Sequence, residues 1–264
     1  MELELQGKTA IITGASKGIG KAIALNLAEE GVNLAICARS KGPLESTAEA
    51  IRKRTGRKVF SQVTDMTDDN SVRNFVEFSL KSLGSVDILV NNAAAPGGLV
   101  TGPLKSADPV KLMLDIDTKV VGYLRAAKAV SEQMKKQGWG RIINIGGLAA
   151  RTAGTISGMR NLALTHLTKT LSNELGPHGI TVNIVHPGAT RTERTKSLQR
   201  TQARVENIRE AEVESRSISD LDVRRMIDAS EIAYLVTFLA SNKAAAITGE
   251  SIAAGGGVGA SVFH

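Results

Sequence analysis

The chain has 264 residues, of which 42% are hydrophobic and 22% charged, with 26 glycines and 6 prolines. This composition is typical of one globular domain with a sizeable core, and it excludes disordered, fibrous and disulfide-stabilised classes. The formal net charge of +7 raises the question of nucleic-acid binding. The basic stretch 191–209 contains no aromatic residue on which bases could stack, so we expect no nucleic-acid partner.

Short apolar runs alternate with amphipathic stretches along the whole chain. In the first half, the predicted strands are 9–13, 32–38, 59–63 and 86–90. The predicted helices are 18–30, a helix that follows the second strand and ends at 55, and 68–83. In the second half, strands at 141–145, 181–185 and 251–254 alternate with helices at 110–136, 155–175 and 231–239. This order predicts a single-domain, Rossmann-like α/β fold over residues 1–264, a doubly wound parallel sheet with helices on both faces. Residues 190–228 are polar, helical and short of strands, like an insertion lying over the sheet.

The amino-terminal segment and the cysteine content bear on where the protein works. The chain begins Met-Glu-Leu-Glu-Leu, which lacks an export pattern, and no apolar run approaches the roughly 20 residues of a membrane span. The single cysteine, Cys37, excludes an internal disulfide. One cysteine and four scattered histidines show no metal-ligand spacing. We therefore expect a cytoplasmic protein without membrane contact and without a bound metal.

A glycine-rich turn separates the first predicted strand from the first predicted helix. Glycines allow the backbone to turn tightly and approach a pyrophosphate, and the helix N-terminus offers free N–H groups and the positive end of its dipole. This strand–turn–helix context predicts a dinucleotide site. The turn reads Thr13-Gly-Ala-Ser-Lys-Gly-Ile-Gly20, and its candidate cofactor-binding residues are Gly14, Ser16, Lys17, Gly18, Ile19 and Gly20.

The TGxxxGxG spacing of this turn resembles that of the short-chain dehydrogenase/reductase family. The segment Asn91-Asn-Ala-Ala94 is similar to the family's NNAG motif, which implies that Asn91, Asn92 and Ala93 support the central sheet and the adenine side. Asp65 and Met66 match the position that contacts adenine in the family.

The resemblance extends over nearly the whole chain. His186-Pro-Gly-Ala-Thr190 resembles the family's PG segment, which implies that Pro187, Gly188 and Thr190 lie beside the nicotinamide carboxamide, and Ile247-Thr-Gly249 matches the closing segment. The resemblance also implies that residues 190–228 form a substrate lid and that the protein is a homotetramer built on its long helices.

The end of the second predicted strand indicates which nicotinamide cofactor binds. An acidic residue there would accept hydrogen bonds from the ribose 2′-hydroxyl and repel a 2′-phosphate. This chain instead has Cys37-Ala-Arg39-Ser40. Arg39 and Lys17 are suited to face a phosphate, and the alternative is that both are solvated surface charges. We expect NADP(H) to be preferred over NAD(H), with Arg39 and Ser40 in the cofactor site.

The catalytic residues of the family are not at their usual places. The resemblance implies an Asn, a Ser and a Tyr-x-x-x-Lys pair in which Tyr is the general acid, but neither Tyr123 nor Tyr234 is followed four residues later by Lys. Anchoring on neighbouring segments places Ser157 at the Tyr position, Asn161 at the Lys position, Gly146 or Gly147 at the Ser position and Lys119 at the Asn position. All four positions depart from the family pattern.

The Asn and Lys positions are exchanged in this chain. In the family these two side chains converge on one water, so we hypothesise that Lys119 supplies positive charge near the nicotinamide ribose while Asn161 hydrogen-bonds to it. The alternative is that Lys119 is a solvated helix residue. Ser157 is a poor replacement acid, because an aliphatic hydroxyl has a pKa far above the value near 10 of tyrosine. His186 closes a strand, which favours a structural role over that of an acid.

These observations favour an NADP(H)-dependent oxidoreductase with an atypical active site, acting on a small carbonyl or hydroxyl substrate. The basic excess in residues 190–228 suggests an anionic substrate such as a carboxylate, a phosphate or an acyl thioester, while a salt-bridged exposed helix explains the same charges. Two other functions stay open: a catalytically silent NADP(H)-binding sensor or supporting subunit, and a non-redox lyase or dehydratase on the same fold.

Overall fold

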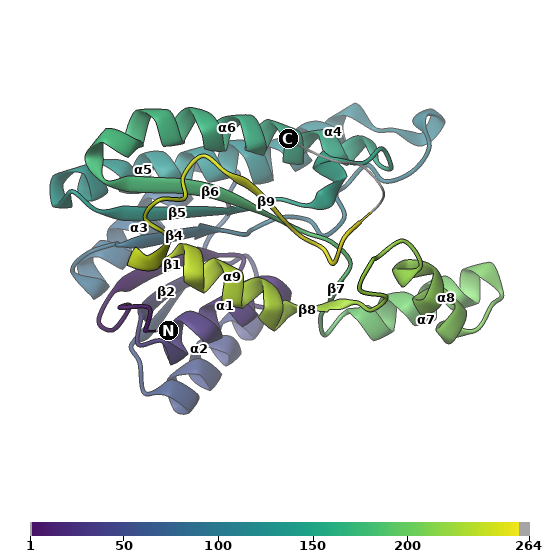
Figure 1. Ribbon diagram of the computed structural model, residues 1–264, viewed down its shortest axis with the longest axis horizontal. Coiled ribbons are helices and arrows are strands. Elements are labelled where there is room, and N and C mark those ends of the chain that lie inside the picture. The colour runs from purple at the N-terminus through teal and green to yellow at the C-terminus, as the bar shows by residue number, and fades with distance from the viewer. Residues whose placement is uncertain (1, 259–264) are drawn as a thin grey trace.

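A seven-stranded, entirely parallel sheet crosses the centre of the computed structural model, which describes residues 2–258 (Figure 1). The strand order is β3-β2-β1-β4-β5-β6-β9. The strands are β1 (Thr9–Thr13), β2 (Asn33–Ala38), β3 (Val59–Val63), β4 (Ile88–Asn91), β5 (Gly140–Ile145), β6 (Ile180–Pro187) and β9 (Ser251–Ala254). The reversal of strand order between β1 and β4 is the point at which doubly wound sheets bind nucleotides, so the predicted fold class is confirmed.

Helices cover both faces of the sheet and complete the two layers of the core. One face is covered by α1 (Gly18–Glu29), α2 (Lys41–Thr55) and α9 (Ala229–Leu239), and the other by α3 (Asp69–Leu83), α5 (Gly122–Gln137) and α6 (Met159–Leu175). Because both faces are covered, β1 and β6 are buried along their whole length. None of the helices within residues 2–258 has the length and apolar character needed to cross a bilayer.

The long helix predicted over 110–136 is interrupted in the structure. It consists of α4 (Pro109–Ile116), a π-helical turn at Asp117–Val121, and α5. Asp108 caps α4 by accepting hydrogen bonds from the N–H groups of Val110 and Lys111. A π-turn inserts an extra residue into the helical ladder, and such turns are frequent at functional sites. Lys119 lies in this turn.

Residues 190–228 differ from the prediction in two respects. They contain the helices α7 (Thr195–Glu206) and α8 (Glu210–Ile218), but also two short strands, β7 (Thr190–Arg191) and β8 (Ile227–Asp228), which pair in parallel at the base of the insertion. Figure 1 shows α7 and α8 beyond the carboxyl ends of the strands and not over a face of the sheet. Both faces are already covered by helices, which leaves this edge for the insertion.

Candidate active site

The glycine-rich turn between β1 and α1 is shaped by contacts that exclude side chains. Gly14 has a φ of +65°, and a Cβ there would lie 2.7 Å from the Ala93 Cα. A Cβ at Gly20 would overlap the Asn92 amide and the Gly14 carbonyl, and Gly18 also has a positive φ, of +59°. Ser16, Lys17 and Ile19 complete the turn, and the Ser16 carbonyl accepts a hydrogen bond from Thr47 Oγ1 at 3.0 Å. The cradle therefore fits the close approach of a pyrophosphate.

The segment after β4 holds this turn in place. Asn92 Nδ2 donates to the carbonyl oxygens of Thr13 and Gly14, both at 3.0 Å, and Thr13 Oγ1 accepts from the N–H groups of Asn92 and Ala93. Asn91 is fully buried and donates to Asn144 Oδ1 at 3.0 Å. Its side chain thus braces the sheet beneath the turn, whereas Asn92 and Ala93 contact the turn itself.

The ends of β2 and β3 form the expected adenosine side. Arg39 and Ser40 follow β2 and are exposed, as is Lys17 at the start of α1. The Asp65 carboxylate accepts hydrogen bonds from the N–H and hydroxyl of Thr67, which hold its pKa below the ordinary value, and the nearby positive charge of Arg39 lowers it further. Met66 is only 4% exposed and packs in the core, so the side chain lies inside the protein at this position.

The expected nicotinamide side is formed by the end of β6 and the segment after it. Pro187 ends β6, and Gly188 approaches Gly255 so closely that a Cβ on Gly188 would lie 2.8 Å from the Gly255 Cα. The Thr190 hydroxyl donates to the Gly188 carbonyl at 3.0 Å, which fixes the bend into β7.

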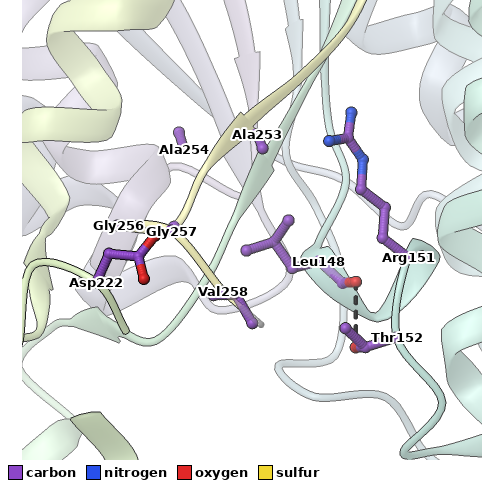
Figure 2. A pocket seen from close by; sticks show the side chains of 10 residues that line it. Leu148, Arg151, Thr152, Asp222, Ala253, Ala254, Gly256, Gly257 and Val258 are labelled. Carbon is purple, nitrogen blue, oxygen red and sulfur yellow. Dashed lines mark hydrogen bonds between the residues drawn. The ribbon is translucent and has the colours of Figure 1, made fainter. Parts of the chain in front are cut away.

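A cavity of about 290 Å³ adjoins this side, between the 148–152 segment, the end of β9 and the insertion (Figure 2). Its walls include Leu148, Arg151, Thr152 and Asp222, together with residues 253–258. Figure 2 shows Arg151 and Asp222 on opposite sides of it. Arg151 also donates to the Ser251 carbonyl at 2.6 Å, so its guanidinium is tied to the start of β9.

Lys119 and Asn161 meet at the carboxyl end of β5. The Lys119 Nζ donates to Asn161 Oδ1 and to the Gly146 carbonyl, both at 2.8 Å, and the side chain is only 3% exposed. The interpretation of Lys119 as a solvated helix residue is therefore wrong. Gly147 adjoins the pair, because a Cβ there would lie 3.0 Å from Asn161 Nδ2. The structure thus brings together Lys119, Asn161 and Gly147.

The surroundings of Lys119 lower its proton affinity. Burial is the main cause that brings the pKa of Lys119 well below its ordinary value of 10.5, and the positive charge of Arg160 adds to this effect, while the negative charge of Asp115 opposes it. An amine with a lowered pKa releases its proton more readily than an exposed lysine does.

Ser157 lies one helical turn before Asn161 but is closed off from the surface. Its Oγ accepts a hydrogen bond from the Val100 N–H at 2.9 Å, and the side chain is 1% exposed. Gly98 packs so tightly on it that a Cβ at Gly98 would overlap the Ser157 Cβ. A side chain as large as tyrosine at position 157 would require the 97–100 segment to move.

Two features of the site are not marked by any sequence motif, so the sequence analysis missed them. The first is a buried ion pair between Asp115 in α4 and Arg160 in α6. The second is Glu193, whose carboxylate accepts a hydrogen bond from the Gly18 N–H at 3.0 Å and lies 3.7 Å from the Lys21 Nζ. A carboxylate from the insertion thus accepts a hydrogen bond from a backbone N–H group of the glycine-rich turn.

Four of the eight arginines in residues 190–228 pair with acids on the same insertion. Arg200 pairs with Glu210, Arg209 with Glu212, and Arg216 with Glu206. Arg191 pairs with both Glu214 and Asp228 at the base of the insertion. These contacts favour the interpretation of the 190–228 charges as a salt-bridged exposed surface.

His186 in β6 is a buried structural residue. Its Nδ1 lies 3.0 Å from the Gly147 N–H nitrogen, which donates to it, and its Nε2 lies 3.3 Å from Thr165 Oγ1. Burial is the main cause that lowers the pKa of His186 from 6.5 to about 4. The ring is therefore neutral near pH 7, and it is no source of protons for catalysis there.

We expect His186 to make the protein less stable as the pH falls. Above pH 6.5 the residue is neutral in both the folded and unfolded states, whereas between pH 6.5 and about 4 the unfolded state alone binds the proton. The free energy of unfolding should therefore decrease by about 3 kcal/mol over this range through His186. Urea denaturation of the wild type and of His186→Asn at several pH values measures the difference. Equal pH dependence in the two proteins would contradict the assignment.

Comparison with known proteins identifies the family. The model of the short chain dehydrogenase family matches residues 8–203. The NADPH-dependent reductase BacG of Bacillus subtilis is 35% identical over 254 residues, which cover 95% of this chain and 97% of that protein. The 3-oxoacyl-[acyl-carrier-protein] reductase FabG of Escherichia coli is 34% identical over 261 residues, covering 97% of this chain and 99% of FabG.

A solved structure agrees with these sequence matches. L-sorbose reductase from Gluconobacter frateurii, complexed with NADPH and L-sorbose, superposes with a TM-score of 0.94 at 26% identity, covering 99% of this chain and 100% of that one. The geometry of the glycine-rich turn, the strand order and these relatives lead to one conclusion: the chain belongs to the short-chain dehydrogenase/reductase family and is an NAD(P)-dependent oxidoreductase.

Proposed function

We propose that this protein is an NADP(H)-dependent reductase or dehydrogenase of a small carbonyl or hydroxyl compound, in which Lys119 and Asn161 replace the catalytic residues usual in the family. The observation that carries this proposal is the hydrogen bond between the Lys119 amine and Asn161 Oδ1, buried at the carboxyl end of β5. The lining of the neighbouring cavity then selects the substrate.

The cofactor would be held along the carboxyl edge of the sheet. The turn from Gly14 to Gly20 would hold the pyrophosphate, Arg39, Ser40 and Lys17 the 2′-phosphate, and Asp65 the adenine side, while Pro187, Gly188 and Thr190 would border the nicotinamide. When bound, the cofactor supplies or accepts the hydride. The glycine-rich cradle supports this placement, because Cβ atoms at Gly14 and Gly20 would fill it.

Lys119 would manage the proton that accompanies the hydride. An ammonium has three N–H donors, and Gly146 and Asn161 account for two of them. The third is available to hold a water that passes a proton to the substrate oxygen during reduction. The lowered pKa of Lys119 supports this role, because a less basic amine gives up its proton more readily.

Substrate selection would depend on the cavity beside the nicotinamide side and on residues 190–228 as its lid. Arg151 and Asp222 bring both signs of charge to the cavity wall. Arg151 lines the cavity, so an anionic substrate bound there would meet its positive charge. The named relatives act on 3-oxoacyl thioesters and on a ketose, which makes acetoacetyl-coenzyme A and L-sorbose useful first probes.

We also propose a homo-oligomer, a tetramer by analogy with the family, built on the long helices. Large apolar side chains are exposed on α4 and α6, with Val110 78%, Met113 64% and Leu162 60% accessible in the single chain. Exposed apolar side chains that lie together mark protein interfaces, so we assign the subunit contacts to α4 and α6. Light scattering of the purified protein determines the number of subunits.

The cofactor preference is tested by calorimetric titration with NADPH and NADH separately. We expect NADPH to bind more tightly, and Arg39→Gln to weaken NADPH binding by about 10- to 100-fold, because a charge-assisted hydrogen bond contributes roughly 1.5–3 kcal/mol. NADH binding should change little. Lys41→Gln, an exposed lysine paired with Glu45, is the matched control. Equal effects of Arg39→Gln on both cofactors would contradict the assignment.

One observation favours a second function, that of a catalytically silent cofactor-binding protein. The position that carries the acid in the family is occupied by Ser157, whose hydroxyl already accepts the Val100 N–H inside the protein. Absorbance at 340 nm with the two probe substrates separates the functions. Consumption of NADPH supports the oxidoreductase, and tight NADPH binding without turnover of any carbonyl in a wider panel supports the silent protein.

A further inference from the structure

A buried ion pair lies directly behind the Lys119 amine. Asp115 precedes Lys119 by four residues along the same helix, and Arg160 immediately precedes Asn161, the residue that accepts a hydrogen bond from Lys119. The Asp115 side chain is fully buried and that of Arg160 is 5% exposed. Asp115 is therefore close in the chain to Lys119, and Arg160 is next to Asn161, so the ion pair and the hydrogen bond join the same two helical segments.

The pair also ties the 95–100 segment to the helices. Arg160 Nη2 donates to the Ala95 carbonyl at 2.9 Å, and Asp115 Oδ2 accepts from the Leu99 N–H at 3.2 Å. The next residue, Val100, donates its N–H to Ser157. Because a buried ion pair adds little net stability once desolvation is counted, these contacts indicate a function in positioning.

Titratable groups from four elements surround Lys119, and two of these groups are charged near neutral pH. Its own helix contributes Asp115, α6 contributes Arg160, and β6 contributes His186, which is neutral near pH 7 because burial lowers its pKa to about 4. On α5, burial raises the pKa of Tyr123, so this phenol is neutral too. Near neutral pH, Asp115 and Arg160 are therefore the charged groups among these neighbours that act on the amine.

We propose that Asp115 and Arg160 form a positioning pair for Lys119: together they hold the 95–100 segment closed against α4 and α6, beside the Lys119–Asn161 hydrogen bond. This inference rests on the proposed function of Lys119. It assigns neither Asp115 nor Arg160 a contact with the substrate, because both act through Lys119 and the segment above it.

Each variant of the ion pair should also change the pKa of Lys119. Removal of the Arg160 charge in Arg160→Met should raise the pKa of Lys119, as expected when a like charge is removed from nearby. Asp115→Asn should lower the pKa of Lys119 below its value in the wild type, because the negative charge of Asp115 stabilises the ammonium. The double variant Asp115→Leu/Arg160→Met replaces the pair with apolar groups and leaves no buried charge unpaired, and its Lys119 titration should differ from that of the wild type because both charges that act on the amine are gone.

The experiment is an NMR titration of the cofactor-free protein labelled with ¹³C at the lysine Cε, with the Lys119 signal assigned by its loss in Lys119→Met. The matched control is Glu29→Leu/Arg54→Met, which removes an exposed ion pair between α1 and α2 and should leave the Lys119 titration unchanged. The double variant at positions 115 and 160 decides the result if Arg160→Met alone does not fold. A Lys119 titration that is the same in the wild type and in the double variant overturns the proposal.

A second readout tests the positioning of the segment. Amide hydrogen exchange at Leu99 and Val100 should accelerate at least tenfold in the double variant, and unchanged exchange there would contradict the closing function. Both measurements are made without cofactor or substrate. Failure of this inference is therefore distinguishable from failure of the proposed function, which NADPH binding and oxidation by the wild type decide.

Discussion

Replacing Lys119 with methionine should reduce NADPH-dependent turnover by about 10²- to 10⁴-fold, the range typical of losing a general acid. Methionine fills a similar volume but cannot donate to the Gly146 carbonyl or to Asn161 Oδ1. In the proposed function, the site then lacks the group that holds the proton-passing water. Turnover is measured as NADPH oxidation with the best carbonyl substrate of the panel, and cofactor affinity by calorimetry on the same preparations.

The control for this variant is Lys128→Met on α5, an exposed lysine that should be replaceable without effect. Thermal unfolding of both variants shows whether a loss of turnover reflects misfolding. Wild-type turnover and cofactor affinity in a folded Lys119→Met protein would exclude Lys119 from the reaction. In the wild type, the rate of reduction should fall as the pH rises through the lowered pKa of Lys119, because the ammonium loses its proton there.

Gly14→Ala should destabilise the protein by about 2–4 kcal/mol and abolish measurable NADPH binding. One part of the cost arises from the positive φ of +65°, which L-residues with a Cβ rarely adopt, and the other from the 2.7 Å approach of the new Cβ to the Ala93 Cα. Relief of this contact moves the segment after β4 away from the turn that Asn92 holds. Urea denaturation gives the loss in stability, and calorimetry gives the loss in binding.

Gly56→Ala provides a matched control for the backbone part of this effect. Gly56 ends α2 with a φ of +69°, but a Cβ there would meet no atom within 4 Å. This variant should therefore lose only about 1 kcal/mol and bind NADPH normally. If Gly14→Ala were no more harmful than Gly56→Ala, the close packing of the turn against Ala93 would be unimportant.

The fold could be predicted from the sequence because its determinants are local. The apolar run 9–13 forms β1 with the predicted bounds, and the glycines that follow it adopt the tight turn that their lack of a Cβ permits. The predicted exchange of residue types at positions 119 and 161 corresponds to two side chains that are hydrogen-bonded to each other. Spacing and the order of motifs sufficed for these features.

Other parts of the site depend on contacts between distant segments, which no local pattern records. Asp115 and Arg160 are 45 residues apart, and neither belongs to a motif. The closure of Ser157 depends on the path of the 97–100 segment, which lies more than 50 residues away along the chain. The arginines of residues 190–228 suggested an anionic ligand for a similar reason. Arg200 and Arg216 have acidic partners on the neighbouring helix, and the sequence does not show which residues of two helices face each other.

The contact between Glu193 and the Gly18 N–H has a consequence for the order of events in catalysis. A helix N-terminus attracts an anion, and here the anion is a side chain of the insertion. A cofactor phosphate that takes this N–H must first displace Glu193, so nucleotide binding and release of the insertion are reciprocally linked. Such competition favours an ordered sequence, in which the nucleotide enters first and releases Glu193 from the turn.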